Sequence, residues 1–401
     1  MHPRSKKTSD GVVGMNGGLD AHGRAVSGMS RGVDARDGVV VGMSGGVDSS
    51  SAAWMLAAEG RRVVGVTLRL YCYARAVRSP RPCCSEAALR DARMLCSRLG
   101  IPHRVVDVEA DFERVVIADF IREYRRGRTP NPCIVCNEKV KFPALARVAD
   151  LLGYRFIATG HYARLVRGSS RGADPDAARG GSTIRLAAAR DAAKDQSYFL
   201  YRVPVRLLER TLFPLGEVTK AEVKRMAASL GIQAAHGLES QDVCFLPEGD
   251  LGAFLSERIG PRPGEVVDRD GNVLGRHDGV HRYTIGQRKG LGIARGKPLH
   301  VESIDAAARR IVLAPKEEVY HSIAVCGSLR LRSSNLDGPL MGKVRYRKPL
   351  AEVASAARSG SRLTVAFREP QWAITPGQSL VLYRDGVVVG GGIIIEGRKQ
   401  E

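Results

Sequence analysis

The residues best suited to chemistry form a glycine-rich loop, SGGVDS, at residues 44–49. A β-branched run at 39–41 precedes the loop and a helix-compatible run follows it, so the loop joins a strand to a helix. Glycines let the backbone approach an anion, and the N–H groups at a helix start point toward it. The lysine of the GxxxxGK[ST] phosphate loop is absent, so the backbone, Ser44 and Ser49 must hold the phosphates. Asp48 is then the natural ligand of a magnesium ion. An ordinary capped glycine turn is the alternative, but it does not explain why strand, glycines and carboxylate occur together.

A second candidate is the pair Cys133-x-x-Cys136. Eight cysteines in 401 residues are too sparse for a disulfide scaffold, so this spacing suggests metal or thiol chemistry in a reducing compartment. Thiolates are strong nucleophiles at neutral pH, especially where basic neighbours lower their pKa, and Arg128 and Lys139 lie close in sequence.

The elements that must position these residues alternate between strand and helix. We expect strands at 39–43, 62–70, 103–108 and 155–159, and helices at 47–58, 85–99, 111–126 and near 142–152. This alternation predicts an α/β fold with a doubly wound parallel sheet covered by helices on both faces. Further on, Thr219-x-x-Glu222 is a capping box that opens a helix to Leu230.

Beyond Leu246 the helical periodicity gives way to short alternating segments. Asp270-Gly271 and Asp385-Gly386 are hairpin signals between Val-rich runs. We therefore expect a small C-terminal antiparallel β-barrel, at about 322–397, after a compact central module. The expected domains are a flexible N-terminal extension at 1–36, a domain with the phosphate-binding loop at 37–246, a central module at 247–315 and the barrel domain at 316–401.

Two segments are expected to lack fixed structure. The extension carries two degenerate copies of the glycine loop, at 14–20 and 28–34, which we interpret as decoys because no long β-branched run precedes them. The polar insertion at 169–182 is expected to be mobile.

The composition favours a polyanionic partner. Lys and Arg exceed Asp and Glu by 62 − 42 = 20, and such an excess attracts nucleic acid or anionic membrane. No apolar stretch is long enough to span a bilayer, so we expect a soluble, cytoplasmic, monomeric protein that binds nucleic acid and no membrane.

The whole pattern resembles a known enzyme family. SGGVDS resembles the PP-loop of the ATP pyrophosphatases, which transfer AMP to a substrate oxygen. Six further segments, in order along the chain, closely resemble the bacterial tRNA-uridine 2-sulfurtransferases, or 2-thiouridylases, from about Asp37 to the C-terminus. They are GRTPNPCIVCNEKVKF (127–142), ATGHYAR (158–164), KDQSYF (194–199), ESQDVCF (239–245), YTIGQRKGL (283–291) and TPGQS (375–379).

The resemblance implies a two-step reaction on the wobble uridine, position 34, in the anticodon stem-loop of tRNA. ATP and Mg²⁺ would serve the first step, in which AMP is attached to the C2 oxygen and pyrophosphate leaves. In the second, sulfur attacks C2 and AMP departs. By resemblance, Cys244 carries that sulfur as a persulfide received from a sulfur-relay protein, and Cys136 releases it by forming a disulfide with Cys244.

The resemblance also assigns binding residues. ATP would be held by Gly42, Met43, Ser44, Gly45, Gly46, Val47, Asp48, Ser49, Leu68 and Gly160. The target base would lie against Asn131, Pro132 and Cys133. Other parts of the tRNA would contact His161, Lys194, Asp195, Gln196, Arg345, Tyr346 and Gln378. For the basic run at 343–348, the alternative is a solvated edge strand protected by its charges.

One position departs from the family. The best-known members carry Asp where this chain has Cys133, which leaves three cysteines, Cys133, Cys136 and Cys244, available at one site. Either these thiolates hold a [4Fe-4S] cluster with one open iron, or the Cys136/Cys244 pair works by persulfide and Cys133 is a spectator. A structural zinc is a weaker reading, because a fourth ligand is not evident.

Two other functions compete. One is a different PP-loop enzyme that makes 2-thiocytidine or amidates a nucleotide; the cysteine pair, the YTIGQRKGL segment and the terminal barrel argue against it. The other is a non-catalytic RNA-binding protein with a vestigial nucleotide site, which the intact SGGVDS loop argues against.

Overall fold

The computed structural model describes residues 18–19, 25–26, 37–70, 86–167, 184–231, 243–246, 251–293 and 297–399. The polar insertion at 169–182 lies outside these ranges, as does most of the N-terminal extension. Within the extension, β1 (Gly18–Leu19) and β2 (Ala25–Val26) form a two-residue antiparallel ladder that we did not expect from the sequence.

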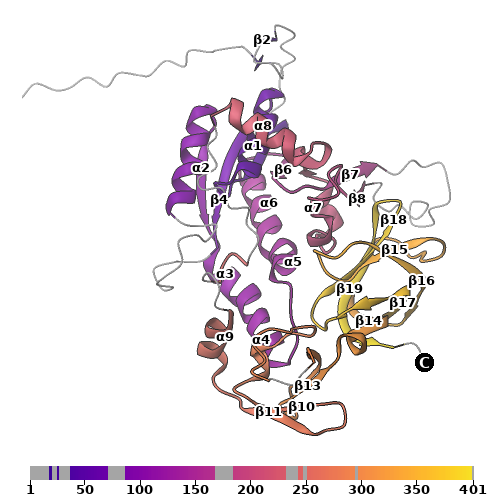
Figure 1. Ribbon diagram of the computed structural model, residues 1–401. Coiled ribbons are helices and arrows are strands. Elements are labelled where there is room, and N and C mark those ends of the chain that lie inside the picture. Colours follow the sequence, from indigo (N-terminus) through magenta and orange to yellow (C-terminus); the bar gives the residue numbers. More distant parts are fainter. Residues whose placement is uncertain are drawn as a thin grey trace, which may run out of the picture.

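A five-stranded parallel sheet forms the centre of the first domain, as predicted. Its order is β5 (His103–Asp107), β4 (Val63–Arg69), β3 (Val39–Gly42), β6 (Phe156–Thr159) and β9 (Thr211–Leu212). Helices cover both faces (Figure 1). Val39 and Val41 pack with α1 (Val47–Ala58) and α2 (Glu86–Arg98), whereas Val40 packs with α6 (Phe142–Leu151). Burial on both faces explains the uninterrupted valine run.

Two helical runs of this domain contain a π-helical turn. The first comprises α3 (Glu109–Phe112), η3 (Glu113–Ile117) and α4 (Ala118–Arg125), close to the helix expected there. The second comprises α5 (Pro132–Cys136), η4 (Asn137–Lys141) and α6. The helix expected near 142–152 is confirmed as α6, but α5 and η4, which precede it in the same run, were not expected. The run begins at Pro132 because the Asn131 side chain accepts a hydrogen bond from the Ile134 N–H, at 3.4 Å, and Pro132 occupies the first helical position.

The remaining helical elements are shorter. They are α7 (Val205–Leu208), α8 (Lys220–Ser229), α9 (Leu251–Ile259) and the 3₁₀ turns η6 (Ser197–Phe199), η7 (Pro214–Glu217), η8 (Val280–Arg282) and η9 (Lys316–Val319). The capping box at the start of α8 is confirmed, because the Thr219 and Glu222 side chains each accept a hydrogen bond from the other's backbone N–H. Among the described helices, none is long and apolar enough to cross a membrane.

The central module is a four-stranded sheet next to α9. Its order is β11 (Val273–His277), β10 (Gly264–Val267), β13 (Arg310–Ala314) and β12 (His300–Asp305). The expected hairpin at Asp270-Gly271 joins β10 to β11, and Gly271 has the positive φ, 86°, that favours glycine there.

The predicted antiparallel barrel is confirmed. Its strands are β14 (Tyr320–Leu331), β15 (Leu340–Lys343), β16 (Ala351–Ser359), β17 (Arg362–Trp372), β18 (Ser379–Arg384) and β19 (Val387–Arg398), and pairing of β14 with β19 closes it. The Asp385-Gly386 hairpin is confirmed as well, with both residues at positive φ.

The barrel sheet continues into the first domain, which we did not predict. The hairpin of β7 (Arg164–Arg167) and β8 (Ile184–Ala187) adds to β19 through the pair Ala187 and Val387. Three fully buried tyrosines, Tyr198, Tyr201 and Tyr383, fill the junction. Because the shared sheet fixes the barrel against the first domain, residues of both can contribute to one site.

Candidate active site

The glycine loop lies at the point where the strand order reverses. Chain order across the sheet runs outward from β3 in both directions, so β3 and β6 flank the switch point, where open α/β sheets bind ligands beyond the carboxyl ends of their strands. Gly42 ends β3 directly beside Thr159, the last residue of β6. The loop that follows Gly42 and the glycine that follows Thr159, Gly160, are therefore neighbours.

Close packing leaves room only for glycine at Gly45, within the loop, and at Gly160, which packs against it. Gly45 has φ of 77°, and a Cβ there would lie 2.5 Å from the Ala88 carbonyl oxygen. A Cβ on Gly160 would lie 2.7 Å from both the Asp48 carbonyl carbon and the Ser49 amide nitrogen. Ser49 Oγ accepts from the Ser44 N–H and lies 3.1 Å from Ser44 Oγ. The loop is thus held in a defined shape, and no side chain caps the first turn of α1. That arrangement suits a phosphate.

Asp48, in the first turn of α1, has two hydrogen-bond donors. Tyr162 Oη donates to its Oδ1 at 2.9 Å, and Lys220 Nζ lies 2.6 Å from the same oxygen. The Asp48 side chain keeps 36% of its surface exposed, so a carboxylate oxygen can still face a magnesium ion that also binds phosphates. Leu68, the remaining predicted ATP contact, is buried near the end of β4.

The cysteines lie on and beside the helix that begins at Pro132. Cys133 is exposed, whereas Cys136, at the end of α5, is buried in the main apolar core. Cys244 is half-buried and packs against that same core. Burial raises the pKa of Cys96 to about 11 and that of Cys326 to about 12, as expected for inert core thiols.

The three thiols do not form a metal site in this structure. Within the described part of the chain, no group of three or more His, Cys, Asp or Glu side chains is placed to hold a metal ion. Cys133 is also exposed while Cys136 is buried. These residues therefore do not fit a three-thiolate cluster here, and we derive no step from one.

His161 connects the glycine loop with the helical run of α5, η4 and α6, which carries Cys133 and Cys136 and is called the cysteine helix below. Its Nδ1 lies 2.7 Å from Thr159 Oγ1, and its ring stacks on Phe142, the first residue of α6, with centroids 5.9 Å apart. Burial, and to a smaller extent the charge of Lys141, lower the pKa of His161 to about 3. The ring is therefore neutral at physiological pH.

The KDQSYF segment is folded against the same region. The buried Asp195 carboxylate accepts from the N–H groups of Ala189 and Ser197 and from Ser197 Oγ. Gln196 accepts from the Tyr162 N–H at 3.0 Å. Lys194 is half-buried in the turn before them. Asp195 and Gln196 thus order the loop that carries Tyr162.

Among the predicted barrel residues, Gln378 contacts the segment that leads into α5, whereas Tyr346 and Arg345 contact other parts of the structure. Gln378 donates to the Thr129 carbonyl oxygen at 2.8 Å, and the Tyr346 ring lies 4.3 Å from that of Phe199. Arg345 donates to the Ile285 carbonyl oxygen at 3.2 Å and to Thr375. The edge-strand alternative for 343–348 is wrong, because β15 ends at Lys343, lies between β16 and β18, and is followed by bends and turns at 344–348.

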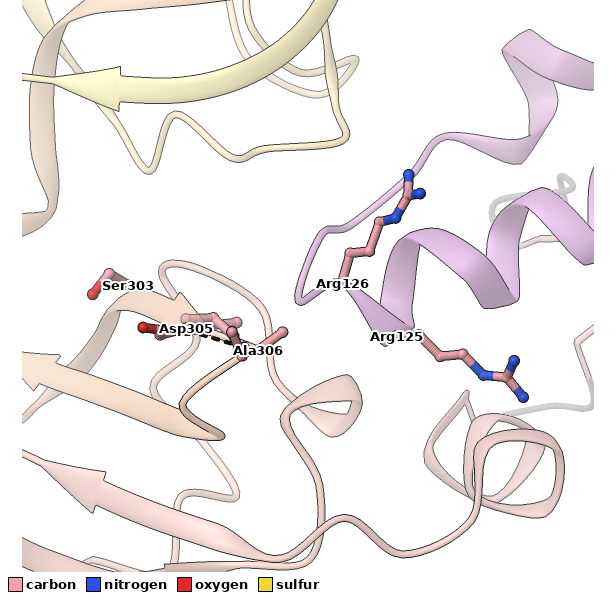
Figure 2. Close-up of a pocket in the computed structure, with 7 residues that line it drawn as sticks. Arg125, Arg126, Ser303, Asp305 and Ala306 are labelled. Carbon is pink, nitrogen blue, oxygen red and sulfur yellow. Dashed lines mark hydrogen bonds between the residues drawn. The ribbon is translucent and has the colours of Figure 1, made fainter.

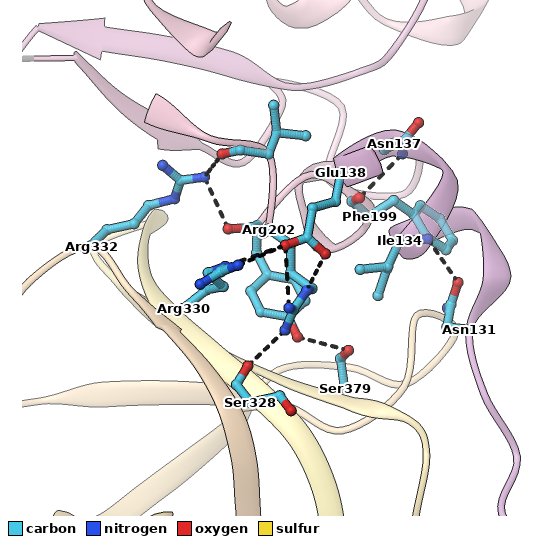
Figure 3. Close-up of polar contacts among 12 residues, drawn as sticks. Asn131, Ile134, Asn137, Glu138, Phe199, Arg202, Ser328, Arg330, Arg332 and Ser379 are labelled. Atoms are coloured by element: carbon cyan, nitrogen blue, oxygen red, sulfur yellow. Dashed lines mark hydrogen bonds and ion pairs between the residues drawn. The ribbon is translucent and has the colours of Figure 1, made fainter. Parts of the chain in front are cut away.

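An ion cluster centred on the buried Glu138 joins the helical run that begins at Pro132 to the barrel (Figure 3). Glu138, in η4, pairs with Arg202 at 2.7 Å and with Arg330 of β14 at 3.2 Å. Arg202 also donates to the Ser328 carbonyl oxygen at 2.7 Å. The sequence offered no signal for this cluster, since its members are far apart along the chain. Arg128, expected near the thiols, pairs with Glu123.

A hollow of about 620 Å³ opens elsewhere, between the end of α4 and the turn after β12 (Figure 2). Arg125 and Arg126 line one side, and Asp305 and its neighbours line the other. It contains none of the predicted site residues. A second hollow, of about 430 Å³, is lined in part by Arg288, Lys297 and Lys316 of the central module.

Fold and site together are those of a PP-loop nucleotide-binding enzyme. Three family models match in succession: "tRNA methyl transferase HUP domain" at residues 37–248, "tRNA methyl transferase PRC-barrel domain" at 252–315 and "Aminomethyltransferase beta-barrel domain" at 331–394.

Two curated relatives give a more specific match. The tRNA-specific 2-thiouridylase MnmA of Geobacter metallireducens is 42% identical over 86% of this chain and 93% of that protein. The tRNA-specific 2-thiouridylase MnmA 1 of Syntrophus aciditrophicus is 43% identical over 87% of this chain and 90% of that protein. Among solved structures, an NMN synthetase from Francisella tularensis is 13% identical with a TM-score of 0.26, covering 50% of this chain and 63% of that one. That likeness carries no argument. The chain belongs to the tRNA-specific 2-thiouridylase family.

Proposed function

We propose that this chain catalyses ATP-dependent 2-thiolation of the wobble uridine, position 34, in tRNA. One observation carries the proposal: the phosphate-binding loop and the cysteine helix are joined through a short rigid connection. Gly160 packs on the loop, and His161, the next residue, stacks on Phe142 at the start of α6. We propose that a base held at the start of α5, on the helical run that continues into Phe142, reaches both ATP and sulfur.

In the first step the C2 oxygen of uridine attacks the α-phosphorus of ATP. The bond between the α-phosphorus and the bridging oxygen breaks, and pyrophosphate leaves. Ser44, Ser49 and the amides of the first turn of α1 hold the phosphates, and Asp48 holds Mg²⁺, which supplies charge neutralisation when bound. Asn131, Pro132 and Cys133 lie at the start of α5, where the base is proposed to bind.

In the second step sulfur replaces the activated oxygen. A sulfur-relay protein first delivers sulfur to Cys244 as a persulfide. Its terminal sulfur attacks C2, the Cys136 thiolate attacks Cys244 Sγ to release that sulfur, and AMP leaves with the former C2 oxygen. A disulfide between Cys136 and Cys244 remains, and an external thiol reductant must reduce it before another turnover. Both cysteines contact one apolar core, which fits a paired role.

The tRNA surface is proposed to extend from α5 over the barrel and the central module. Tyr346 and Phe199 present aromatic rings beside α5, and unpaired anticodon bases stack on such rings. The Nε atom of Arg345 is buried and has no hydrogen-bond partner among the described residues. Arg125, Arg126, Arg288 and Lys316 line the two hollows and are suited to RNA phosphates.

Methyl transfer is the second candidate, because the descriptions of two matching family models name a methyl transferase. The site favours thiolation. A glycine loop at a helix start is suited to phosphates, and methyl transfer requires neither such a loop nor a pair of cysteines.

The identity of the nucleotide products tests the proposal. Purified protein is incubated with α-labelled ATP, Mg²⁺, a persulfide donor and tRNA that lacks the modification. We expect AMP and pyrophosphate in a tRNA-dependent reaction. ADP and phosphate as the main products would refute it.

A further inference from the structure

A lysine from a distant part of the chain reaches the carboxylate of the glycine loop. Lys220 is the first residue of α8, and its Nζ lies 2.6 Å from Asp48 Oδ1. Its side chain is only 12% exposed, and its ammonium also lies 5.7 Å from the centre of the Tyr162 ring. The glycine loop has no lysine of its own, but the fold brings the Lys220 ammonium next to it.

This ammonium lies beside the helix turn where the phosphate is expected. Asp48 belongs to the first turn of α1, the turn whose amides are suited to bind the anion. Lys220 also stands in the first turn of α8, so a second helix N-terminus lies next to the loop. The β- and γ-phosphates of ATP bring several negative charges toward a loop whose own charged side chain is acidic. An adjacent ammonium offsets that repulsion.

Anchoring of α8 does not require this ion pair. The capping box of Thr219 and Glu222 closes the start of the helix. The Lys220 N–H donates to Asp191 at 2.9 Å, and the Val223 side chain is fully buried. These contacts use the backbone and apolar surface, so they leave the Lys220 ammonium available for a ligand.

We propose that Lys220 is a phosphate ligand of ATP, which Asp48 holds in position. When Mg²⁺ and ATP bind, Asp48 turns to the cation and Lys220 turns to the β- and γ-phosphates, the group that leaves as pyrophosphate. The inference rests on the proposed ATP-dependent function and adds to it the residue that distinguishes ATP from AMP.

Binding of three ligands to a Lys220→Gln variant tests this inference. Dissociation constants are measured by calorimetry for MgATP, magnesium pyrophosphate and AMP. We expect those of MgATP and pyrophosphate to rise about ten- to hundredfold, and that of AMP to change less than about twofold. Lys224→Gln, the same change one turn along α8 at an exposed position, is the matched control and should alter none of them.

Equal weakening of all three ligands, or of none, would overturn the assignment, because a purely structural lysine cannot distinguish pyrophosphate from AMP. If wild-type protein binds no ATP, the proposed function itself fails and the assignment with it. A second measurement needs no variant: acylation of Lys220 in the wild-type protein is followed by peptide mass spectrometry. Magnesium pyrophosphate should slow the reaction and AMP should not, whereas equal rates would contradict the proposal.

Discussion

Removal of Glu138 should loosen the cysteine helix from the barrel. In the wild-type protein Glu138 and Arg202 are both nearly buried, with 6% and 10% of their side chains exposed, and they share two hydrogen bonds of 2.7 and 3.2 Å. Glu138→Ala leaves the Arg202 charge inside the protein with the Ser328 carbonyl oxygen as its remaining partner in Figure 3. Breaking such a buried pair from one side costs about 3–5 kcal/mol.

Arg330 supplies the matched control. Its side chain is 57% exposed, and it contacts the same Glu138 carboxylate at 3.2 Å. Solvent screens such a pair, so Arg330→Ala should cost at most about 1 kcal/mol. Urea unfolding of the two variants, followed by the fluorescence of Trp54 and Trp372, compares the two free energies in one protein.

The two variants should differ in function as well. Glu138 follows Cys136 closely along one helical run, so Glu138→Ala should reduce thiolation more than it reduces ATP binding. If Glu138→Ala and Arg330→Ala destabilise the protein by the same small amount, the cluster does not hold the helix and this reasoning is refuted.

The remaining predictions concern the cysteines, the extension and acid stability. Cys244→Ser should still release pyrophosphate from ATP in the presence of tRNA but form no 2-thiouridine, since activation precedes sulfur attack; a normal thiolation rate in this variant would contradict the persulfide role. Cys133→Ser should reduce the thiolation rate only slightly, and the protein should contain no iron or labile sulfide after anaerobic purification. A protein that starts at residue 37 should bind ATP and thiolate as the full chain does, and loss of ATP binding would show that a loop copy in the extension matters. The lowered pKa of His161, about 3 against 6.5 in the unfolded chain, means that the unfolded state binds the extra proton between these values. Stability should therefore fall as the pH drops below about 6.5, by up to about 1.4 kcal/mol per pH unit from this group, and denaturant titrations of His161→Phe should show a shallower fall than the wild type.

Much of the fold could be predicted because its signals are local. The valine run before the loop, the alternation of strands and helices, the capping box at Thr219 and the Asp-Gly hairpins each depend on residues close in sequence. The start of α5 was missed although its signal was present, since Asn131-Pro132 is a helix cap followed by proline at the first helical position.

The contacts between distant segments could not be predicted. Lys220 is 172 residues from Asp48, and Arg330 is 192 residues from Glu138. Ala187 meets Val387 through a single strand pairing that leaves no periodic pattern. Such pairs depend on how the domains pack, and one sequence carries no local trace of that packing.

The composition of tRNA nucleosides after reaction tests the central claim most directly. Unmodified tRNA is incubated with the protein, ATP, Mg²⁺ and a persulfide donor, then digested and analysed by mass spectrometry. We predict 2-thiouridine at position 34, dependent on ATP and lost in Cys244→Ser. A methylated nucleoside, or a tRNA without thiolated uridine under these conditions, would contradict the proposed function.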